Sequence, residues 1–185
     1  MKNLKINQNL QYFSALGFYE NGISLVKMIS ENTGNKALEI APVAAVNVSF
    51  AAELLLKLIC HLDTTKTIHE HKLNKIFQSL DKDLQQEIEK KYNENKLDST
   101  NDLKTIKLAF NTEENNPEDQ TSNFDINDLV LDDLLNIHSE GFVKWRYAYE
   151  VENKYYSYEF NFNLMNEFIK ALLFIIEMKT KDVKA

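Results

Sequence analysis

The residue with the most distinctive chemistry is Arg146, the only arginine in a chain whose other permanent positive charges are all lysine. It lies in the stretch GFVKWRYAYE, Gly141 to Glu150, directly after the only tryptophan, Trp145. A guanidinium is planar and always charged, so it can stack on aromatic rings while it grips a carboxylate or phosphate. We predict one of two roles: an anion-binding group, or a packing anchor paired with Glu150 and stacked on Trp145, Tyr147 or Tyr149.

Histidine is the second residue type that could do chemistry here, and His138 stands eight residues before Arg146. A histidine and an arginine together can cleave RNA, because the histidine moves the proton of the 2′-hydroxyl and the arginine stabilises charge on the phosphorane. His71 could transfer the proton in place of His138 if the fold brings it near Arg146. The catalytic candidates are therefore Arg146, His138 and His71.

Several other chemistries have no support in the sequence. There is no phosphate-binding glycine loop, no Gly-x-Ser-x-Gly and no kinase or zinc signature. His69 and His71 are two residues apart, whereas ligands that share a helix face need a spacing of three or four. Cys60 and His61 are adjacent and would point about 100° apart on a helix, which argues against a nucleophile and base pair. We expect no metal, no cofactor and a buried thiol.

The helix expected from Pro42 to Leu62 carries one narrow polar row. Ser49, Glu53, Lys57 and His61 follow one another at intervals of four, while almost every other position is apolar. This pattern is typical of the central helix of a bundle. Glu53 before Lys57 is also the favourable order for an ion pair within a helix, worth about 0.3 to 0.5 kcal/mol if it is exposed.

Apolar residues at helical spacing predict further helices on both sides of this one. We expect helices from Leu10 to about Ser30, within 71–80 and within 82–92, then one that begins near Asn127, and a last one capped by Asn163. The face of the helix near Asn127 should comprise Leu129, Val130, Leu134 and Ile137.

The segments between these helices are expected to be irregular or short. Residues 32–36 should turn around Gly34, 103–110 should extend the bundle or be irregular, and 111–125 should form an acidic loop. The alternation in YYSYEFNF suits a short extended segment near residues 154–160. With 185 residues, four glycines and two prolines, the chain fits one all-α domain spanning 1–185, an up-and-down helical bundle.

The charge is unevenly placed. The net charge is −7, yet between Lys107 and Lys144 there are nine acidic residues and no lysine or arginine. That is a poor footprint for general nucleic-acid binding, which neutralises phosphates with clustered basic residues. The lone cysteine and the absence of an apolar leader segment predict a cytoplasmic protein with no membrane association.

Three pieces of the chain resemble the HEPN superfamily, the small helical domains of prokaryotic toxin–antitoxin, phage-defence and RNA-processing systems. They are SFAAELLLKLIC, with Glu and Lys four apart, HKLNKIFQSL, and FVKWRYAYE. The resemblance implies an up-and-down bundle that commonly dimerises. In active members, an arginine, a polar residue and a histidine, with four to six residues between the arginine and the histidine, form an RNase site across the dimer.

Only Arg146 carries over from that motif. Val151, Glu152 and Asn153 stand where the histidine would, and Tyr147 replaces the polar neighbour. An arginine can hold a phosphate but cannot move a proton at neutral pH. The departure therefore argues against RNase activity by the usual chemistry.

These observations favour a HEPN-like binding or interaction module in a prokaryotic defence or toxin–antitoxin setting. Its working groove should contain the residues Arg146, Tyr147, Glu150, Glu53, Lys57 and His71. The expected partners are a second copy of the chain, a protein such as a nucleotidyltransferase antitoxin, and RNA. The alternatives are a metal-independent ribonuclease toxin with a rearranged Arg/His site, and a structural subunit of a larger assembly.

Overall fold

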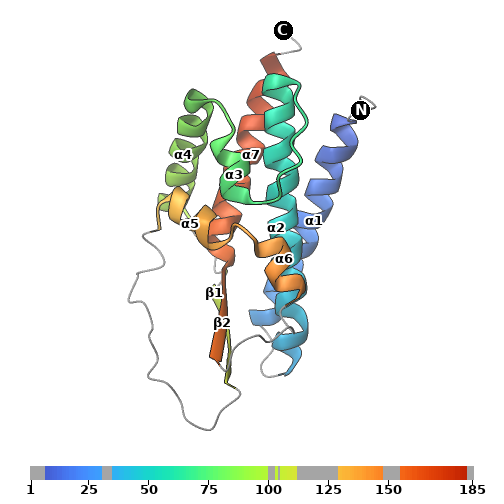
Figure 1. Ribbon diagram of the computed structural model, residues 1–185, viewed down its shortest axis with the longest axis vertical. Helices are drawn as coiled ribbons and strands as arrows, with labels where there is room; N and C mark the ends of the chain where they lie inside the picture. The colour runs from blue at the N-terminus through green and yellow to red at the C-terminus, as the bar shows by residue number, and fades with distance from the viewer. Residues whose placement is uncertain are drawn as a thin grey trace.

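The computed structural model describes residues 7–30, 35–99, 103, 105–111, 129–147 and 155–182. Helices dominate these residues, and a two-stranded antiparallel sheet accompanies them (Figure 1). In chain order the elements are α1 (Gln8–Ser30), α2 (Asn35–Thr64), α3 (Leu73–Gln78), α4 (Lys82–Leu97), β1 (Thr105–Asn111), α5 (Leu131–Ile137), α6 (Gly141–Arg146), β2 (Tyr155–Asn161) and α7 (Phe162–Asp182). The predicted helical bundle is confirmed.

The long helix α2 lies at the centre of this bundle. It packs against α1, α7, α6 and α3, and α4 in turn covers α7. The helices α1, α2, α4 and α7 alternate in direction along the chain, as an up-and-down bundle requires (Figure 1). Small buried residues on α2 let its neighbours approach closely: Ala41, Ala44, Ala45, Ala51 and Ala52. This helix is central because its surface is apolar almost all round.

The last helix, α7, supplies the other half of the core. Its broad apolar face is buried as predicted, through Leu164, Met165, Phe168, Ile169, Leu172, Ile175 and Ile176. The helix begins one residue before Asn163, so the prediction that Asn163 caps it is wrong. The cap is Asn161, whose side-chain oxygen accepts a hydrogen bond from the Leu164 N–H at 3.0 Å.

A buried polar cluster joins three helices beside this core. The Tyr19 hydroxyl of α1 donates to Asn166 Oδ1 at 2.6 Å, and the Asn166 amide donates to Glu167 Oε1 at 3.0 Å. Asn95 of α4 donates to the Glu167 carbonyl, and Lys170 pairs with the Glu167 carboxylate. Burial raises the pKa of Tyr19 to about 12, so its hydroxyl stays protonated as a donor. We regard this cluster as structural, because each member bonds to another.

The two strands pair antiparallel over their whole length, from Thr105 opposite Asn161 to Asn111 opposite Tyr155. The extended segment predicted near 154–160 is confirmed as β2. The prediction for 103–110 is wrong, since Thr105–Asn111 is a strand rather than helix or irregular chain. Its partner strand lies about fifty residues further along the chain, so the local sequence pattern does not predict that the two strands pair. Apart from Asn111, the expected acidic loop of 111–125 lies outside the described residues.

Two helix boundaries also differ from expectation. Helix α2 begins at Asn35, so Pro42 stands inside it and not in its first turn. Helix α5 begins at Leu131 rather than near Asn127, and its buried residues are Leu131, Leu134 and Leu135. The predicted face was partly wrong, because Val130 and Ile137 are about half exposed (51% and 52%). The turn predicted around Gly34 lies outside the described residues.

One helix among the described residues, Lys36–Thr64, is long and apolar enough to cross a membrane by length and composition. Its most apolar window is 72% buried inside the fold, and core helices of soluble proteins pass the same test. The match is therefore weak evidence for a membrane span.

Two glycines of α1 provide a matched test of its packing on α2. A Cβ on Gly22 would meet Val48 Cγ2 at 2.7 Å and the Val48 nitrogen at 3.2 Å, whereas a Cβ on Gly17 would meet nothing within 4 Å. We predict that Gly22→Ala lowers the free energy of unfolding by about 1 to 3 kcal/mol through overpacking. Gly17→Ala should raise it by about 1 kcal/mol, because alanine is the better helix former.

Urea unfolding of the two variants beside the wild type measures both changes. Equal effects of the same sign would contradict the close contact of α1 with α2 at Gly22.

Candidate functional site

The polar row predicted on α2 is present, and its first half is buried. Ser49 and Glu53 are 1% and 2% exposed, whereas Lys57 and His61 are partly exposed. The Lys57 ammonium donates to Glu53 Oε1 at 2.9 Å, so the predicted ion pair forms. Its energetic setting differs from the exposed pair assumed from the sequence. A buried carboxylate costs much more to leave unpaired than a surface one.

His71 completes this cluster from the connection between α2 and α3. Its Nδ1 lies 2.9 Å from Glu53 Oε1, the same oxygen that Lys57 contacts. A carboxylate only accepts, so the Nδ1 donates this bond and the Nε2 is the ring nitrogen left for another partner. The His71 side chain is 65% exposed, which leaves this nitrogen within reach of a ligand.

Backbone contacts fix the position of His71. Glu70 Oε1 accepts hydrogen bonds from the N–H groups of His71 and Lys72, at 2.8 and 3.0 Å, and these bonds lower the pKa of the Glu70 carboxyl. The following amide, Leu73 N–H, donates to the Ser139 carbonyl at 3.1 Å. The connection is therefore tied both to α2 and to the turn that leads into α6.

Unused hydrogen-bonding capacity gathers along the same row. Among the described residues, the buried side-chain polar atoms without a partner are Gln11 Oε1, Ser49 Oγ, Glu53 Oε2 and His61 Nδ1. All but the first belong to the row. Because buried polar atoms are nearly always hydrogen-bonded, this row is the place in the described structure where further polar contacts are most expected.

Helix α6 crosses α2 beside this row. A Cβ on Gly141 would meet Ser49 Oγ at 2.5 Å, so only glycine lets the start of α6 lie this close to α2. Phe142 then stacks on Phe50 of α2, with ring centroids 4.8 Å apart, and Phe50 meets Phe18 of α1 edge-on at 4.7 Å. The aromatic rings thus form a continuous ladder across α1, α2 and α6.

Arg146 lies at the end of that ladder. Its guanidinium carbon is 4.9 Å from the Phe142 ring centroid and 4.6 Å from that of Tyr147, and the residue is exposed. Stacking on Tyr147 is confirmed, whereas Trp145 is buried (3%) against Phe160. No ion pair joins Arg146 to a described residue. Tyr149 and Glu150 lie outside the described residues, so the pairing with Glu150 stays a prediction.

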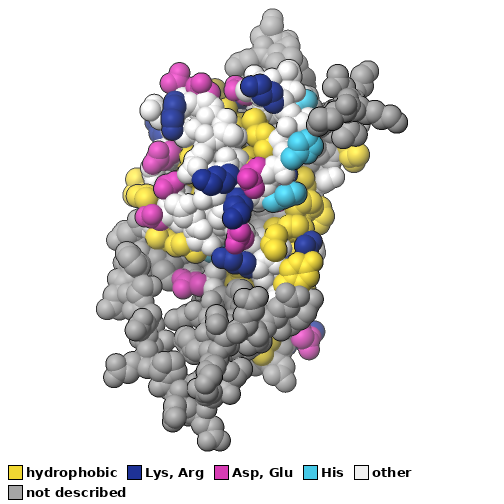
Figure 2. Space-filling model, viewed as in Figure 1, with side chains coloured by type: hydrophobic (Ala, Val, Ile, Leu, Met, Phe, Trp, Pro, Cys, Tyr) yellow, Lys and Arg dark blue, Asp and Glu magenta, His cyan; other side chains and the backbone are white. Residues whose placement is uncertain are grey.

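A small ion network holds His71 and α6 on one face of α2. Glu140 accepts from Lys72 at 2.8 Å through Oε1 and lies 3.5 Å from Lys144 through Oε2. Chiefly through the hydrogen bond from Lys72, these lysines lower the pKa of the Glu140 carboxyl. Figure 2 shows this face, where basic and acidic side chains intermix in the middle and histidine and hydrophobic side chains lie along one side.

His138, the third catalytic candidate, has a different environment. It is 2% exposed, its Nε2 accepts from the Asn161 N–H at 3.3 Å, and its ring packs on Phe160 at 4.6 Å. Burial lowers the pKa of His138 to about 4. A neutral histidine that supports the junction of β2 and α7 is poorly placed to exchange protons with a ligand, which weakens its candidacy.

The described candidates therefore form two groups: Glu53 and Lys57 of α2 with His71, and Arg146 at the end of α6 with Tyr147. Sequence reasoning missed Phe142 and Glu140, which position the second group. Phe142 could have been found, because it precedes Arg146 by four residues and so shares its helix face. Among the described residues no three histidine, cysteine, aspartate or glutamate side chains converge on a common point.

Comparison with known proteins finds no family model that matches this chain, and no characterised protein or solved structure that is significantly similar to it. The resemblance to the HEPN superfamily consequently depends on the sequence motifs.

The burial of His138 predicts a specific dependence of stability on pH. The unfolded histidine has a pKa near 6.5 and the folded one about 4, so between these values the unfolded state binds more protons. Stability from this residue is complete above pH 6.5 and is lost as the pH falls towards 4. We predict a loss of about 3 kcal/mol over that window.

The matched variant is His138→Gln, which keeps a hydrogen-bond acceptor but does not titrate. Its free energy of unfolding, measured by urea at several pH values, should fall less steeply between pH 6.5 and 4 than that of the wild type. If the free energies of unfolding of the variant and the wild type changed with pH in parallel, His138 would not be buried in its neutral form.

The buried carboxylate of Glu53 predicts a second effect. Glu53→Gln removes the charge that Lys57 and His71 share, so it should lower the free energy of unfolding by about 1 to 3 kcal/mol. The control is Glu39→Gln, since Glu39 also pairs with a lysine of α2 but is 63% exposed. Chemical denaturation that gives the same small change for both variants would contradict the burial of Glu53.

Proposed function

We propose that this chain is a HEPN-like binding and interaction module of the cytoplasm in a prokaryotic defence or toxin–antitoxin setting, and that it works without the usual RNase site. The observation that carries the proposal is Arg146, an exposed residue whose guanidinium lies over the rings of Phe142 and Tyr147. Its proposed ligands are RNA or an anionic patch on a partner protein, such as a nucleotidyltransferase antitoxin.

Stacking supports this proposal in two ways. The two neighbouring rings restrict the rotation of the guanidinium, so less entropy is lost when it binds a phosphate or carboxylate. Stacking engages the flat face of the group, whereas its edge carries the N–H donors that can make two parallel hydrogen bonds to an anion. The aromatic ladder that ends at Arg146 also offers flat surfaces on which unpaired bases can stack.

The electrostatics favour a local contact over general nucleic-acid binding. Lys144 stands two residues before Arg146, but both it and Lys72 contact Glu140, so among the described residues these lysines add little uncompensated charge to α6. The chain as a whole carries −7. We therefore propose recognition of a short unpaired segment or a single anionic group, with a shallow dependence on salt.

The test is RNA binding by variants of Arg146. Fluorescence anisotropy with a short single-stranded RNA at low salt should give a Kd that rises about tenfold or more in Arg146→Ala. Arg146→Lys should lose most of the same affinity, because an ammonium keeps the charge but not the planar, stacked geometry.

The charge-matched control is Lys82→Ala on α4, whose ammonium donates a hydrogen bond to Gln85 and forms no ion pair with a described residue. Thermal melts should show that all three variants are folded. An RNA affinity that falls equally in Lys82→Ala, or an Arg146→Ala protein that is unfolded, would contradict the proposed role. If the wild type binds no RNA, the protein-partner form remains to be tested by co-purification with the products of neighbouring genes.

One observation favours the second candidate, a metal-independent ribonuclease with a rearranged site. The Nδ1–H of His71 is held by a buried carboxylate, which is the way acid–base histidines are oriented in many enzymes. In that case RNA cleavage in the presence of a chelator should disappear in both His71→Gln and Arg146→Ala, while His71→Gln still binds RNA. Cleavage that survives in His71→Gln would exclude this mechanism.

A further inference from the structure

Two buried polar atoms on the row of α2 have no hydrogen-bond partner among the described residues: Ser49 Oγ and Glu53 Oε2. Both residues are almost fully buried, at 1% and 2% exposure. Buried hydroxyl and carboxylate oxygens nearly always bond to a protein group or to an ordered water. The two atoms therefore mark a place inside the fold that suits a small polar molecule.

The two atoms belong to neighbouring side chains on one side of α2. Ser49 and Glu53 are four residues apart, so their side chains are adjacent on the helix surface. Helical side chains lean towards the N-terminus of their helix, which directs the Glu53 side chain over the turn that carries Ser49. The other carboxylate oxygen, Oε1, already accepts from Lys57 and His71. Oε2 is thus the oxygen left for a partner shared with Ser49.

Helix α6 covers this place. A Cβ on Gly141 would lie 2.5 Å from Ser49 Oγ and 3.5 Å from the ring of Phe160. The backbone at the start of α6 therefore passes directly beside the Ser49 hydroxyl and separates it from solvent. A molecule bound to this hydroxyl is enclosed between α2 and α6, and only a small one fits.

The charge and the donors around the two atoms define the ligand. The negative charge of Glu53 is balanced by the Lys57 ammonium at 2.9 Å, so the place favours a neutral molecule over a cation. A carboxylate oxygen only accepts, so the ligand must donate to Oε2, whereas the Ser49 hydroxyl can donate to the ligand. Water is the smallest neutral molecule that both donates and accepts, and a buried water typically makes about three hydrogen bonds.

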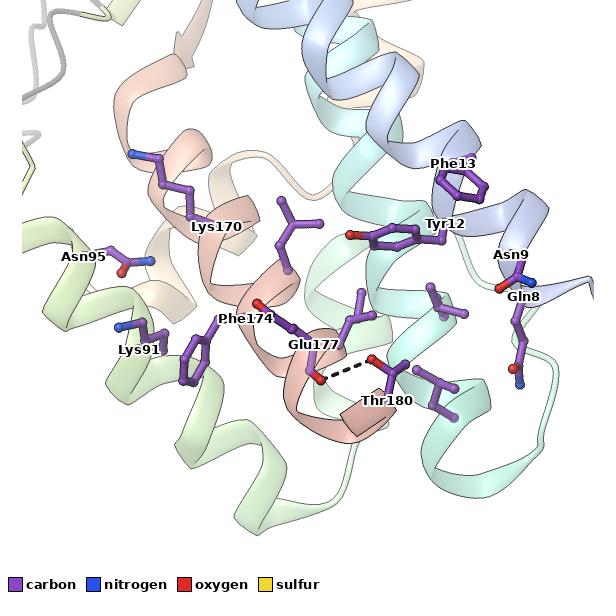
Figure 3. Close-up of a pocket in the computed structure, with 14 residues that line it drawn as sticks. Gln8, Asn9, Tyr12, Phe13, Lys91, Asn95, Lys170, Phe174, Glu177 and Thr180 are labelled. Atoms are coloured by element: carbon purple, nitrogen blue, oxygen red, sulfur yellow. Dashed lines mark hydrogen bonds between the residues drawn. The ribbon is translucent and has the colours of Figure 1, made fainter. Parts of the chain in front are cut away.

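The groove that runs along α7 lies on another side of α2. Its volume is about 640 Å³, and Figure 3 shows α1 and α4 on its two sides with α7 between them. Leu58 and Leu62 of α2 contribute to its lining. Each follows a member of the polar row by one position, which turns it about 100° away from that row. A molecule held by Ser49 and Glu53 is therefore not a ligand of this groove.

We propose that Ser49 Oγ and Glu53 Oε2 bind one internal water molecule beneath the start of α6. The water donates to the Glu53 carboxylate and accepts from the Ser49 hydroxyl. It completes the hydrogen bonding of the buried carboxylate whose other oxygen holds Lys57 and His71. The proposal does not depend on the proposed function, since neither RNA nor Arg146 takes part in it.

Oxygen-17 magnetic relaxation dispersion tests this site, because it counts the water molecules that a protein holds inside its fold. Ser49→Ala should lower the count by about one relative to the wild type, since a buried water needs at least two polar partners and the variant leaves only Glu53. The matched control is Ser24→Ala on α1, where the serine is exposed, and its count should equal that of the wild type. Circular dichroism should show both variants folded.

A crystal structure of the wild type gives a second measurement that needs no variant. It should show one water within hydrogen-bonding distance of both Ser49 Oγ and Glu53 Oε2. A direct hydrogen bond between the two side chains, a cation at this place, or a partner group from elsewhere in the chain would overturn the proposal. An equal water count in Ser49→Ala and the wild type would also overturn it. The RNA-binding result for Arg146 decides none of these, so the two proposals can fail separately.

Discussion

The arrangement of this protein depends on one buried negative charge, the carboxylate of Glu53 in the middle of α2. A carboxylate that is 2% exposed must be compensated by charges or hydrogen-bond donors. Lys57 supplies one donor from the same helix, and His71 supplies the other from the connection that follows. Satisfying Glu53 therefore brings a segment eighteen residues away back onto α2.

That return of the chain positions the rest of the candidate site. Once His71 is held, Lys72 reaches Glu140, and Leu73 bonds to Ser139 in the turn before α6. Gly141 then allows α6 to lie against Ser49 on the same row of α2. Arg146 consequently lies at the end of α6, a helix whose first residues are held in place by contacts with α2 and with the segment after it. A guanidinium held in this way can select an anion by geometry instead of by charge alone.

Sequence reasoning succeeded where the cause is local. Apolar spacing predicted the helices, and the interval of four between Glu53 and Lys57 predicted their ion pair, because both features depend only on the geometry of one helix. It failed where the cause is distant. The strand Thr105–Asn111 depends on a partner about fifty residues away, and the burial of Glu53 and His138 depends on helices that pack over them. The contact between Glu53 and His71 could not be foreseen, since nothing in either segment specifies that they meet. The contact of Phe142 with Arg146, by contrast, is predictable from the sequence, because residues four apart share one face of a helix.

A double-mutant cycle between Glu53 and His71 tests most directly whether the buried carboxylate organises the site. The free energy of unfolding would be measured for the wild type, Glu53→Gln, His71→Gln and the double variant. If the two side chains bond as the structure shows, the effects of the single changes should fail to add by about 1 kcal/mol, since residues in contact couple. Effects that add within about 0.5 kcal/mol, as for distant and independent sites, would contradict the account.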